Sequence, residues 1–240
     1  MPEGTFSNSY SRLGPTALGT RGKVQLALAI LCNLAIVIME CIAFRLLWVD
    51  CPSLKALSIF YTNWSNLFAL VFSALFVLLG VPALFRDGRM PHWLKVWRLV
   101  VTLQLYVTWL VVFVGFVSML PTGAVSFAAM YGRSMFVMHL LAPIVSLVSF
   151  LFLEGTPRLT WGDAFKAIIP TLIYTAILVP LNFKGIVDGP YDFLRVRQNP
   201  TWLNFVYAVT LLPGDYLVAV VGKFLNDVIA CRIAGIDRER

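Results

Sequence analysis

The chain has 240 residues, of which 59% are hydrophobic and only 13% are charged. A soluble globular domain carries about 25% charged and about 45–50% apolar residues, so the charges here are too few to cover a water-exposed surface. The composition excludes a soluble enzyme, a disordered chain and a disulfide scaffold, and it favours a protein of the lipid bilayer. The net charge of +7 does not indicate a nucleic-acid partner, because no stretch is a basic patch with interleaved aromatic residues.

Apolar stretches long enough to cross a bilayer occur six times along the chain. A spanning helix needs about 20 mostly apolar residues, and such stretches lie roughly at 24–48, 55–80, 94–119, 126–152, 163–181 and 202–229. The sequence therefore predicts an all-α, polytopic transmembrane bundle of six spans. Its expected parts are a flexible tail at 1–23, a membrane domain at 24–229 and a short basic tail at 230–240.

The distribution of Lys and Arg predicts the orientation, because cytoplasmic loops carry an excess of these residues. If the N-terminus is cytoplasmic, the inside set is Arg12, Arg21, Lys23, Arg86, Arg89, Lys95, Arg98, Arg158, Lys166, Arg232, Arg238 and Arg240. The outside set is then smaller and contains Lys55, Arg133, Lys184, Arg195 and Arg197. We therefore expect both termini in the cytoplasm.

Three of the predicted spans contain an ionisable side chain at depth. These are Glu40 in the first span, His139 in the fourth and Asp215 in the sixth. A charge at the bilayer centre costs about 2.5–3.5 kcal/mol on insertion scales, so such residues usually face the interior of the bundle. His139 is either a neutral hydrogen-bonded histidine or a proton carrier, and its titration near neutral pH favours the carrier. The two carboxyls are neutral, paired across helices or part of a proton path.

A polar cluster occupies residues 61–66 of the second predicted span. Thr62, Ser65 and Asn66 stand at positions i, i+3 and i+4, which places them on one helical face. Small polar residues commonly connect transmembrane helices, and this interpretation stays open. With Asn63, however, the segment has four hydrogen-bonding side chains, which is more than one contact between helices needs. The cluster therefore also predicts a pocket that offers a hydroxyl and amide donors.

Three motifs, in this order and spacing, resemble those of a known family. They are Tyr61-Thr62-Asn63-Trp64-Ser65-Asn66, Met138-His139 with Pro143, and the loop from Leu181-Asn182 to Gly189-Pro190-Tyr191-Asp192-Phe193-Leu194. Over roughly residues 55–229, the chain resembles the androgen-induced and androgen-dependent integral membrane hydrolases and their bacterial relatives. These small multi-pass proteins use an intramembrane threonine nucleophile and a histidine base to hydrolyse fatty acid esters of hydroxy fatty acids. A more distant branch is associated with acyl transfer between lipids.

The resemblance implies that Thr62 is the nucleophile and His139 the base of a lipid-ester hydrolase or acyl transferase. Its substrates would be membrane lipids or fatty acyl esters, with no metal, no other cofactor and no nucleic acid. Asn63, Asn66 and Asn182 are candidate donors to the oxyanion that ester attack creates. Ser65 and Asp215 are expected to line the same site, and Asp215 or Glu40 would orient His139 only if helix packing brought one of them to it.

Two other classes of function stay open at this stage. A small proton-coupled transporter would use Glu40, His139 and Asp215 as a relay, with the Pro213-Gly214 break as a bend in a discontinuous helix. A non-catalytic membrane protein would use the polar residues only for helix contacts. The catalytic interpretation makes two geometric predictions: Thr62 and His139 face one interior cavity, and the 182–201 loop packs back over that cavity through its aromatic residues.

Overall fold

The computed structural model describes residues 19–86, 90–119, 126–127, 131–155 and 158–234. Within these residues, six helices are long and apolar enough to cross a membrane, and no strand occurs. The prediction of an all-α bundle with six spans is confirmed. Most of the expected tails, residues 1–18 and 235–240, lie outside the described residues, while α1 begins at Thr20 and α10 continues to Ala234.

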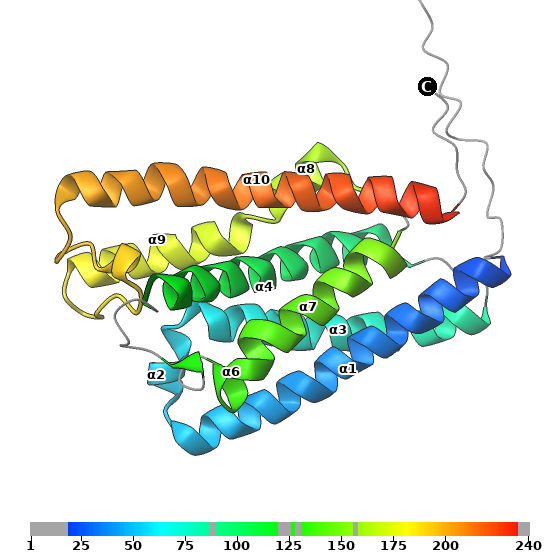
Figure 1. Ribbon diagram of the computed structural model, residues 1–240, viewed down its shortest axis with the longest axis horizontal. Helices are drawn as coiled ribbons and strands as arrows, with labels where there is room; N and C mark the ends of the chain where they lie inside the picture. Colours follow the sequence, from blue (N-terminus) through cyan, green and yellow to red (C-terminus); the bar gives the residue numbers. More distant parts are fainter. Residues whose placement is uncertain (1–18, 87–89, 120–125, 128–130, 156–157, 235–240) are drawn as a thin grey trace, which may run out of the picture.

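Successive spans run in opposite directions along the bundle (Figure 1). In chain order they are α1 (Thr20–Asp50), α2 (Leu54–Ser58), α3 (Tyr61–Phe85), α4 (His92–Met119), α6 (Ser134–Phe136), η3 (Val137–Leu141), α7 (Ala142–Val148), η4 (Ser149–Leu153), α8 (Trp161–Lys166), α9 (Ile169–Phe183), η5 (Asp192–Leu194) and α10 (Thr201–Ala234). The segment from α6 to η4 forms one continuous span that contains two π-helical turns, η3 and η4.

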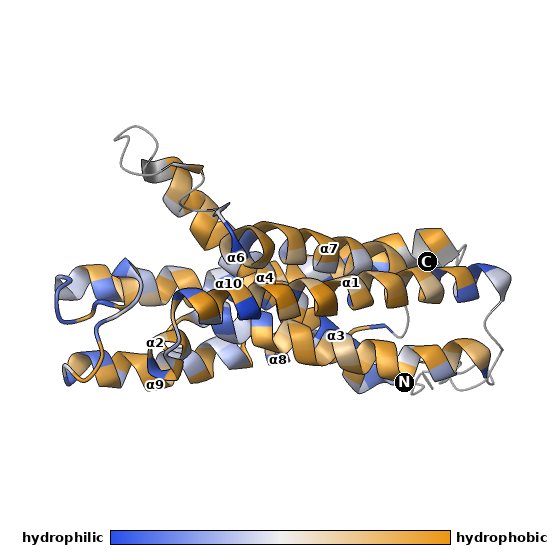
Figure 2. Ribbon diagram, turned by 90° about the horizontal axis from the view of Figure 1, so that it is seen from below, coloured by the Kyte–Doolittle hydropathy of each residue, from blue (hydrophilic) through white to orange (hydrophobic). Residues whose placement is uncertain are grey.

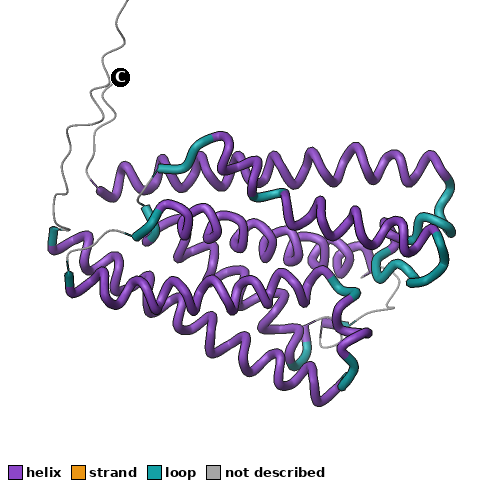
Figure 3. The backbone as a smooth tube through the Cα atoms, turned by 180° about the vertical axis from the view of Figure 1, so that it is seen from behind, coloured by secondary structure: helices purple, strands orange, loops and turns teal. Residues whose placement is uncertain are grey.

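The helices α1 and α10 lie at opposite edges of the bundle, with α4 and α7 between them (Figure 1; Figure 3 from behind). The start of α1 and the end of α10 lie at the same end of the bundle. We call the other end, formed by residues 51–60 and 184–200, the loop end. Apolar residues cover the outer surfaces of the spans, as a lipid-facing surface requires (Figure 2).

Two spans begin later than the hydropathy predicts. As a result, Thr62 and His139 lie closer to the starts of their helices than the sequence indicates. Ser53 caps the short helix α2, and Phe60 is extended, so the second span begins only at Tyr61. Thr62 therefore lies in the first turn of α3. The fourth span begins at Ser134, so His139 lies near its start rather than at its middle.

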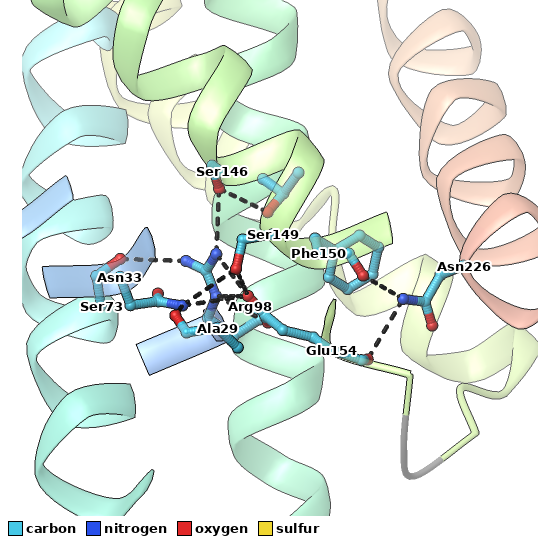
Figure 4. Close-up of polar contacts among 10 residues, drawn as sticks. Ala29, Asn33, Ser73, Arg98, Ser146, Ser149, Phe150, Glu154 and Asn226 are labelled. Carbon is cyan, nitrogen blue, oxygen red and sulfur yellow. Dashed lines mark hydrogen bonds and ion pairs between the residues drawn. The ribbon is translucent and has the colours of Figure 1, made fainter. Parts of the chain in front are cut away.

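A buried polar network joins four helices at the centre of the bundle (Figure 4). Arg98 of α4 is fully buried, and its guanidinium pairs with the Glu154 carboxylate at 3.0 Å. The same guanidinium donates to the hydroxyl oxygens of Ser73 on α3 and Ser146 on α7. Asn33 of α1 donates to Glu154 at 3.2 Å. The network satisfies both charges and fixes the helices relative to one another.

Two residues of the inside set, Lys95 and Arg98, do not lie in a connection between spans. Both are buried in α4. Lys95 donates to the Gly155 carbonyl at 2.8 Å, and Arg98 is neutralised by Glu154. A long charged side chain near the start of a helix can point into the bundle when a buried carboxylate pairs with it. The hydropathy of the surrounding residues does not show whether such a partner exists.

The first π-helical turn, η3, has a cause in the sequence. Pro143 has no N–H group, and its ring would clash with the carbonyl of His139 in a regular α-helix. The backbone widens instead, and Ala142 donates to the Val137 carbonyl five residues earlier. His139 thus sits in an irregular turn, which is where functional residues of membrane helices are often found.

Candidate functional site

A cavity of about 850 Å³ opens between α3, α4, α9 and the first half of α10. Its walls are mostly apolar, with Val107, Val111, Leu172, Leu211 and Leu217 among the lining side chains. The N-terminal turn of α3 and the loop before α10 close it at the loop end. A volume of this size suits a small molecule or a lipid chain, since ligand pockets typically measure about 300–1,000 Å³.

Thr62 and Tyr191 form the polar wall of this cavity at the loop end. The Thr62 hydroxyl lies 3.3 Å from the Tyr191 phenol oxygen, and that oxygen also accepts a hydrogen bond from the Thr62 backbone N–H at 3.3 Å. Thr62 belongs to the first turn of α3, where backbone N–H groups and the helix dipole favour negative charge. A hydroxyl, a phenol and a helix N-terminus therefore meet at one point of the wall.

Burial raises the pKa of the Tyr191 phenol, while its hydrogen bonds with Thr62 act in the opposite direction. The phenol is consequently protonated throughout the neutral range. Because its oxygen already accepts the Thr62 N–H, its own proton is free to be donated to the Thr62 hydroxyl or to an oxygen of a bound molecule.

The remaining polar wall comes from α3, α4 and α9. The Tyr61 phenol lies 2.7 Å from the Thr171 hydroxyl, which donates to the Gln104 side chain at 3.3 Å. Tyr174 donates to the Ile59 carbonyl at 2.6 Å and so ties α9 to the start of α3. These contacts fix the Tyr61 and Tyr174 rings at a centroid distance of 5.0 Å.

The three asparagines proposed as oxyanion donors have other partners. Asn63 donates to the Leu57 carbonyl at 2.7 Å, and Asn66 donates to the Thr62 carbonyl at 2.7 Å. Asn182 donates to the Val187 carbonyl at 2.9 Å, and none of the three lines the cavity. Their amides shape the start of α3 and the loop instead. The donor that faces the cavity at Thr62 is the Tyr191 phenol.

Ser65 lies one helical turn after Thr62 in α3 and contacts residues of the cavity wall without lining the cavity itself. Its hydroxyl donates to the Thr62 carbonyl at 2.9 Å and lies 3.1 Å from the hydroxyl of Thr108 on α4. Thr108 lines the cavity, whereas Ser65 does not. The predicted polar face of the segment therefore exists, but only Thr62 and its neighbour Tyr61 present their side chains to the cavity.

His139 is buried in η3, and it does not line this cavity. The expectation that Thr62 and His139 face one shared cavity is not met here. The two residues nevertheless belong to adjoining elements, because η3 packs against α3, α4 and α1. Both lie near the start of their spans, which brings the candidate site towards the loop end instead of the centre of the bundle.

Asp215 lines the cavity from α10 and is almost completely buried. Glu40 is fully buried on α1, next to residues that pack against η3 and α3. These two carboxyls belong to helices at opposite edges of the bundle (Figure 1). The arrangement does not favour a direct relay between them, which the transporter hypothesis requires. Within the described residues, no group of three or more His, Cys, Asp or Glu side chains is placed to hold a metal ion.

The loop between α9 and α10 packs back onto the bundle, as the sequence predicts. Leu194 is buried against Tyr174 and Leu178 of α9, and Tyr191 and Phe193 stack at 5.2 Å over the cavity. Gly189 permits this course, because a side chain there would collide with the backbone carbonyl of Leu194. Tyr191 was identified in the sequence only as part of this roof, and its contact with Thr62 is a structural finding.

Comparison with protein-family models, curated proteins and solved structures finds no match to this chain. The resemblance therefore rests on the motifs alone, and the geometry described above carries the argument about function.

Proposed function

We propose that this chain is an intramembrane lipid-ester hydrolase or acyl transferase with Thr62 as its nucleophile. The observation that carries the proposal is the position of the Thr62 hydroxyl, which stands in the wall of a large apolar cavity beside a protonated phenol and a helix N-terminus. An acyl chain fits the apolar part of such a cavity, and its ester group then lies at the polar wall.

The chemistry proceeds in two steps. The Thr62 oxygen bonds to the ester carbonyl carbon while its proton passes to a base, and the ester C–O bond breaks as the leaving alcohol takes that proton. Water then attacks the acyl-threonine and releases a fatty acid, whereas a second lipid hydroxyl gives transfer. The Tyr191 phenol and the dipole of α3 stabilise the negative charge on the carbonyl oxygen.

His139 is the base in this proposal, since imidazole titrates near neutral pH and η3 packs against α3. Because His139 does not line the cavity, the proton passes through a bridging water or hydroxyl, which is an accepted geometry for general-base catalysis. Asp215 lines the cavity and is the competing base. The two assignments make different predictions for single substitutions.

The first test measures release of free fatty acid from a panel of lipid esters by the purified protein. Thr62→Ala is expected to abolish turnover and labelling by a serine-hydrolase-type activity probe. His139→Gln is expected to lower turnover about 10²–10⁴-fold, the usual contribution of a general base. Thr62→Ala should still fold, because losing one polar contact between membrane helices costs only about 1 kcal/mol.

Thr210→Ala is the matched control for this test. Thr210 also lines the cavity, but its hydroxyl is bonded to the Val206 carbonyl of its own helix at 2.7 Å. This variant should keep turnover and labelling. Wild-type turnover in Thr62→Ala would refute the nucleophile, and a loss in Asp215→Asn with normal turnover in His139→Gln would transfer the base role to Asp215.

A second prediction concerns the volume of the cavity. Gly214 lines it, and a side chain at this position would meet no atom within 4 Å. Gly214→Leu is therefore expected to fill the cavity, leave the thermal stability unchanged or raised, and lower turnover of long-chain esters more than that of short-chain esters. Gly115→Leu is the control, because Gly115 has equal space but lies outside the cavity lining. Equal chain-length profiles in the two variants would contradict the assignment of the acyl site.

A further inference from the structure

Asp215 presents an unsatisfied negative group to the cavity. The residue is 4% exposed, and neither carboxylate oxygen has a partner at normal hydrogen-bonding distance among the described residues. Thr171 is its polar neighbour, but the Thr171 hydroxyl is already engaged between Tyr61 and Gln104. A buried carboxylate without partners is unfavourable, and a positive group from outside the chain would stabilise its ionised form.

The cavity offers no cation of its own to this carboxylate. Among the described residues that line it there is no Lys, Arg or His, and Asp215 is the single charged side chain. Two cations near its ends are already paired, Lys223 with Asp227 at 2.9 Å and Arg195 with Asp192 at 3.1 Å. The complementary ligand therefore carries positive charge, and a ligand with a free carboxylate would be repelled.

Aromatic side chains surround the same space. The rings of Tyr61, Tyr174, Tyr191, Phe193 and Tyr207 all line the cavity. Tyr191 stacks on Phe193 at 5.2 Å, and Phe193 meets Tyr207 of α10 edge-on at 6.2 Å, so the rings form a continuous series from the loop to α10. Aromatic faces attract cations, and aromatic cages recognise quaternary ammonium groups.

We propose that the cavity recognises an amphiphile whose head group is a monovalent ammonium or quaternary ammonium, with Asp215 as counter-ion and the tyrosine-rich wall as its cage. The alkyl chain of this ligand lies along the apolar side chains of α4, α9 and α10. The assumption that the cavity binds a lipid rests on the proposed function. The new element is the chemical class of the lipid head group.

The test is equilibrium binding of radiolabelled dodecyltrimethylammonium to the full chain in dodecyl maltoside, whose sugar head group is uncharged and contains no nitrogen. Saturable binding is expected, displaced by the unlabelled cation and much less by dodecanol or dodecanoate, which carry the same chain with a neutral or a negative head. Asp215→Asn is expected to weaken binding about tenfold or more. The amide keeps the shape of the carboxyl, so this variant should fold.

Two controls separate the counter-ion from general effects. Asp227→Asn removes a carboxylate of the same helix that pairs with Lys223 and does not line the cavity, so it should bind like wild type. Tyr207→Leu should weaken binding severalfold, whereas Tyr207→Phe keeps the ring and should not. An unchanged affinity in Asp215→Asn, equal displacement by dodecanol, or no saturable binding would overturn the proposal.

The binding assay requires no turnover, so it fails or succeeds independently of the catalytic proposal. Cation binding that depends on Asp215, together with normal turnover in Thr62→Ala, would leave the head-group assignment standing and remove Thr62 as nucleophile. Loss of turnover in Thr62→Ala with no effect of Asp215→Asn on binding would support Thr62 as nucleophile and overturn the head-group assignment.

Discussion

Arg98→Met is expected to lower the free energy of unfolding by about 3–5 kcal/mol, the usual effect of removing one partner of a buried ion pair. The Glu154 side chain is 3% exposed and would keep its charge without the guanidinium that now donates to both of its oxygens. The hydroxyls of Ser73 and Ser146 would lose a donor at the same time. Thermal unfolding of the purified protein in one fixed detergent measures the loss.

The double variant Arg98→Met/Glu154→Gln identifies the cause of this loss. Glutamine keeps an oxygen for Asn33 and Ser149 but removes the uncompensated charge, so the double variant should be more stable than Arg98→Met alone. Arg133→Met is the control, because its pair with Asp50 is exposed and worth about 0–1 kcal/mol. Equal stability of the single and double variants would mean that lost packing, not charge, dominates.

Gly189→Ala is expected to lower turnover strongly, although Gly189 does not line the cavity. A methyl group at this position would collide with the Leu194 carbonyl and come within 2.8 Å of the Arg195 nitrogen, so the loop backbone must move. Tyr191 is carried by this loop, and its contact with Thr62 would be lost. A displacement of about 1 Å at a catalytic contact costs about 10²-fold in rate, and turnover of the lipid ester measures it.

A stability measurement accompanies this prediction and does not depend on the catalytic proposal. Overpacking of this kind costs about 1–3 kcal/mol, so Gly189→Ala should also unfold at lower temperature. Gly162→Ala is the matched control, because a methyl group there would meet only Thr160 at an ordinary distance of 3.7 Å, and alanine favours the helix. Wild-type turnover and stability in Gly189→Ala would show that the loop adapts without moving Tyr191.

The number of spans was predictable because hydropathy over about 20 residues is a strong signal. The position of the candidate site along the spans was not. Residues 55–60 are apolar enough to extend the second span, and only the Ser53 cap and the extended Phe60 interrupt it. Thr62 was identified correctly as a cavity residue, but its place in the first turn of α3 depends on that interruption.

The partners of the polar residues were the least predictable part. Asn63, Asn66 and Asn182 resemble free donors in the sequence, yet each is engaged by a nearby backbone carbonyl, a contact set by turn geometry. Arg98 and Glu154 are separated by 56 positions and lie at the ends of predicted spans, so they resemble loop charges. Long-range pairing of this kind depends on which helices pack together, and this cannot be read from a single sequence.

The two π-helical turns make the fourth span sensitive to its exact length. Each turn adds one residue to the helical repeat, and Glu154 follows η4 directly, donating its N–H to the Ser149 carbonyl five residues earlier. Removing one residue of α7, with both π turns kept, would rotate everything beyond it by about 100°. Glu154 would then face away from Arg98. Related chains should therefore tolerate insertions and deletions in the connections of this span but conserve the residue count from His139 to Glu154.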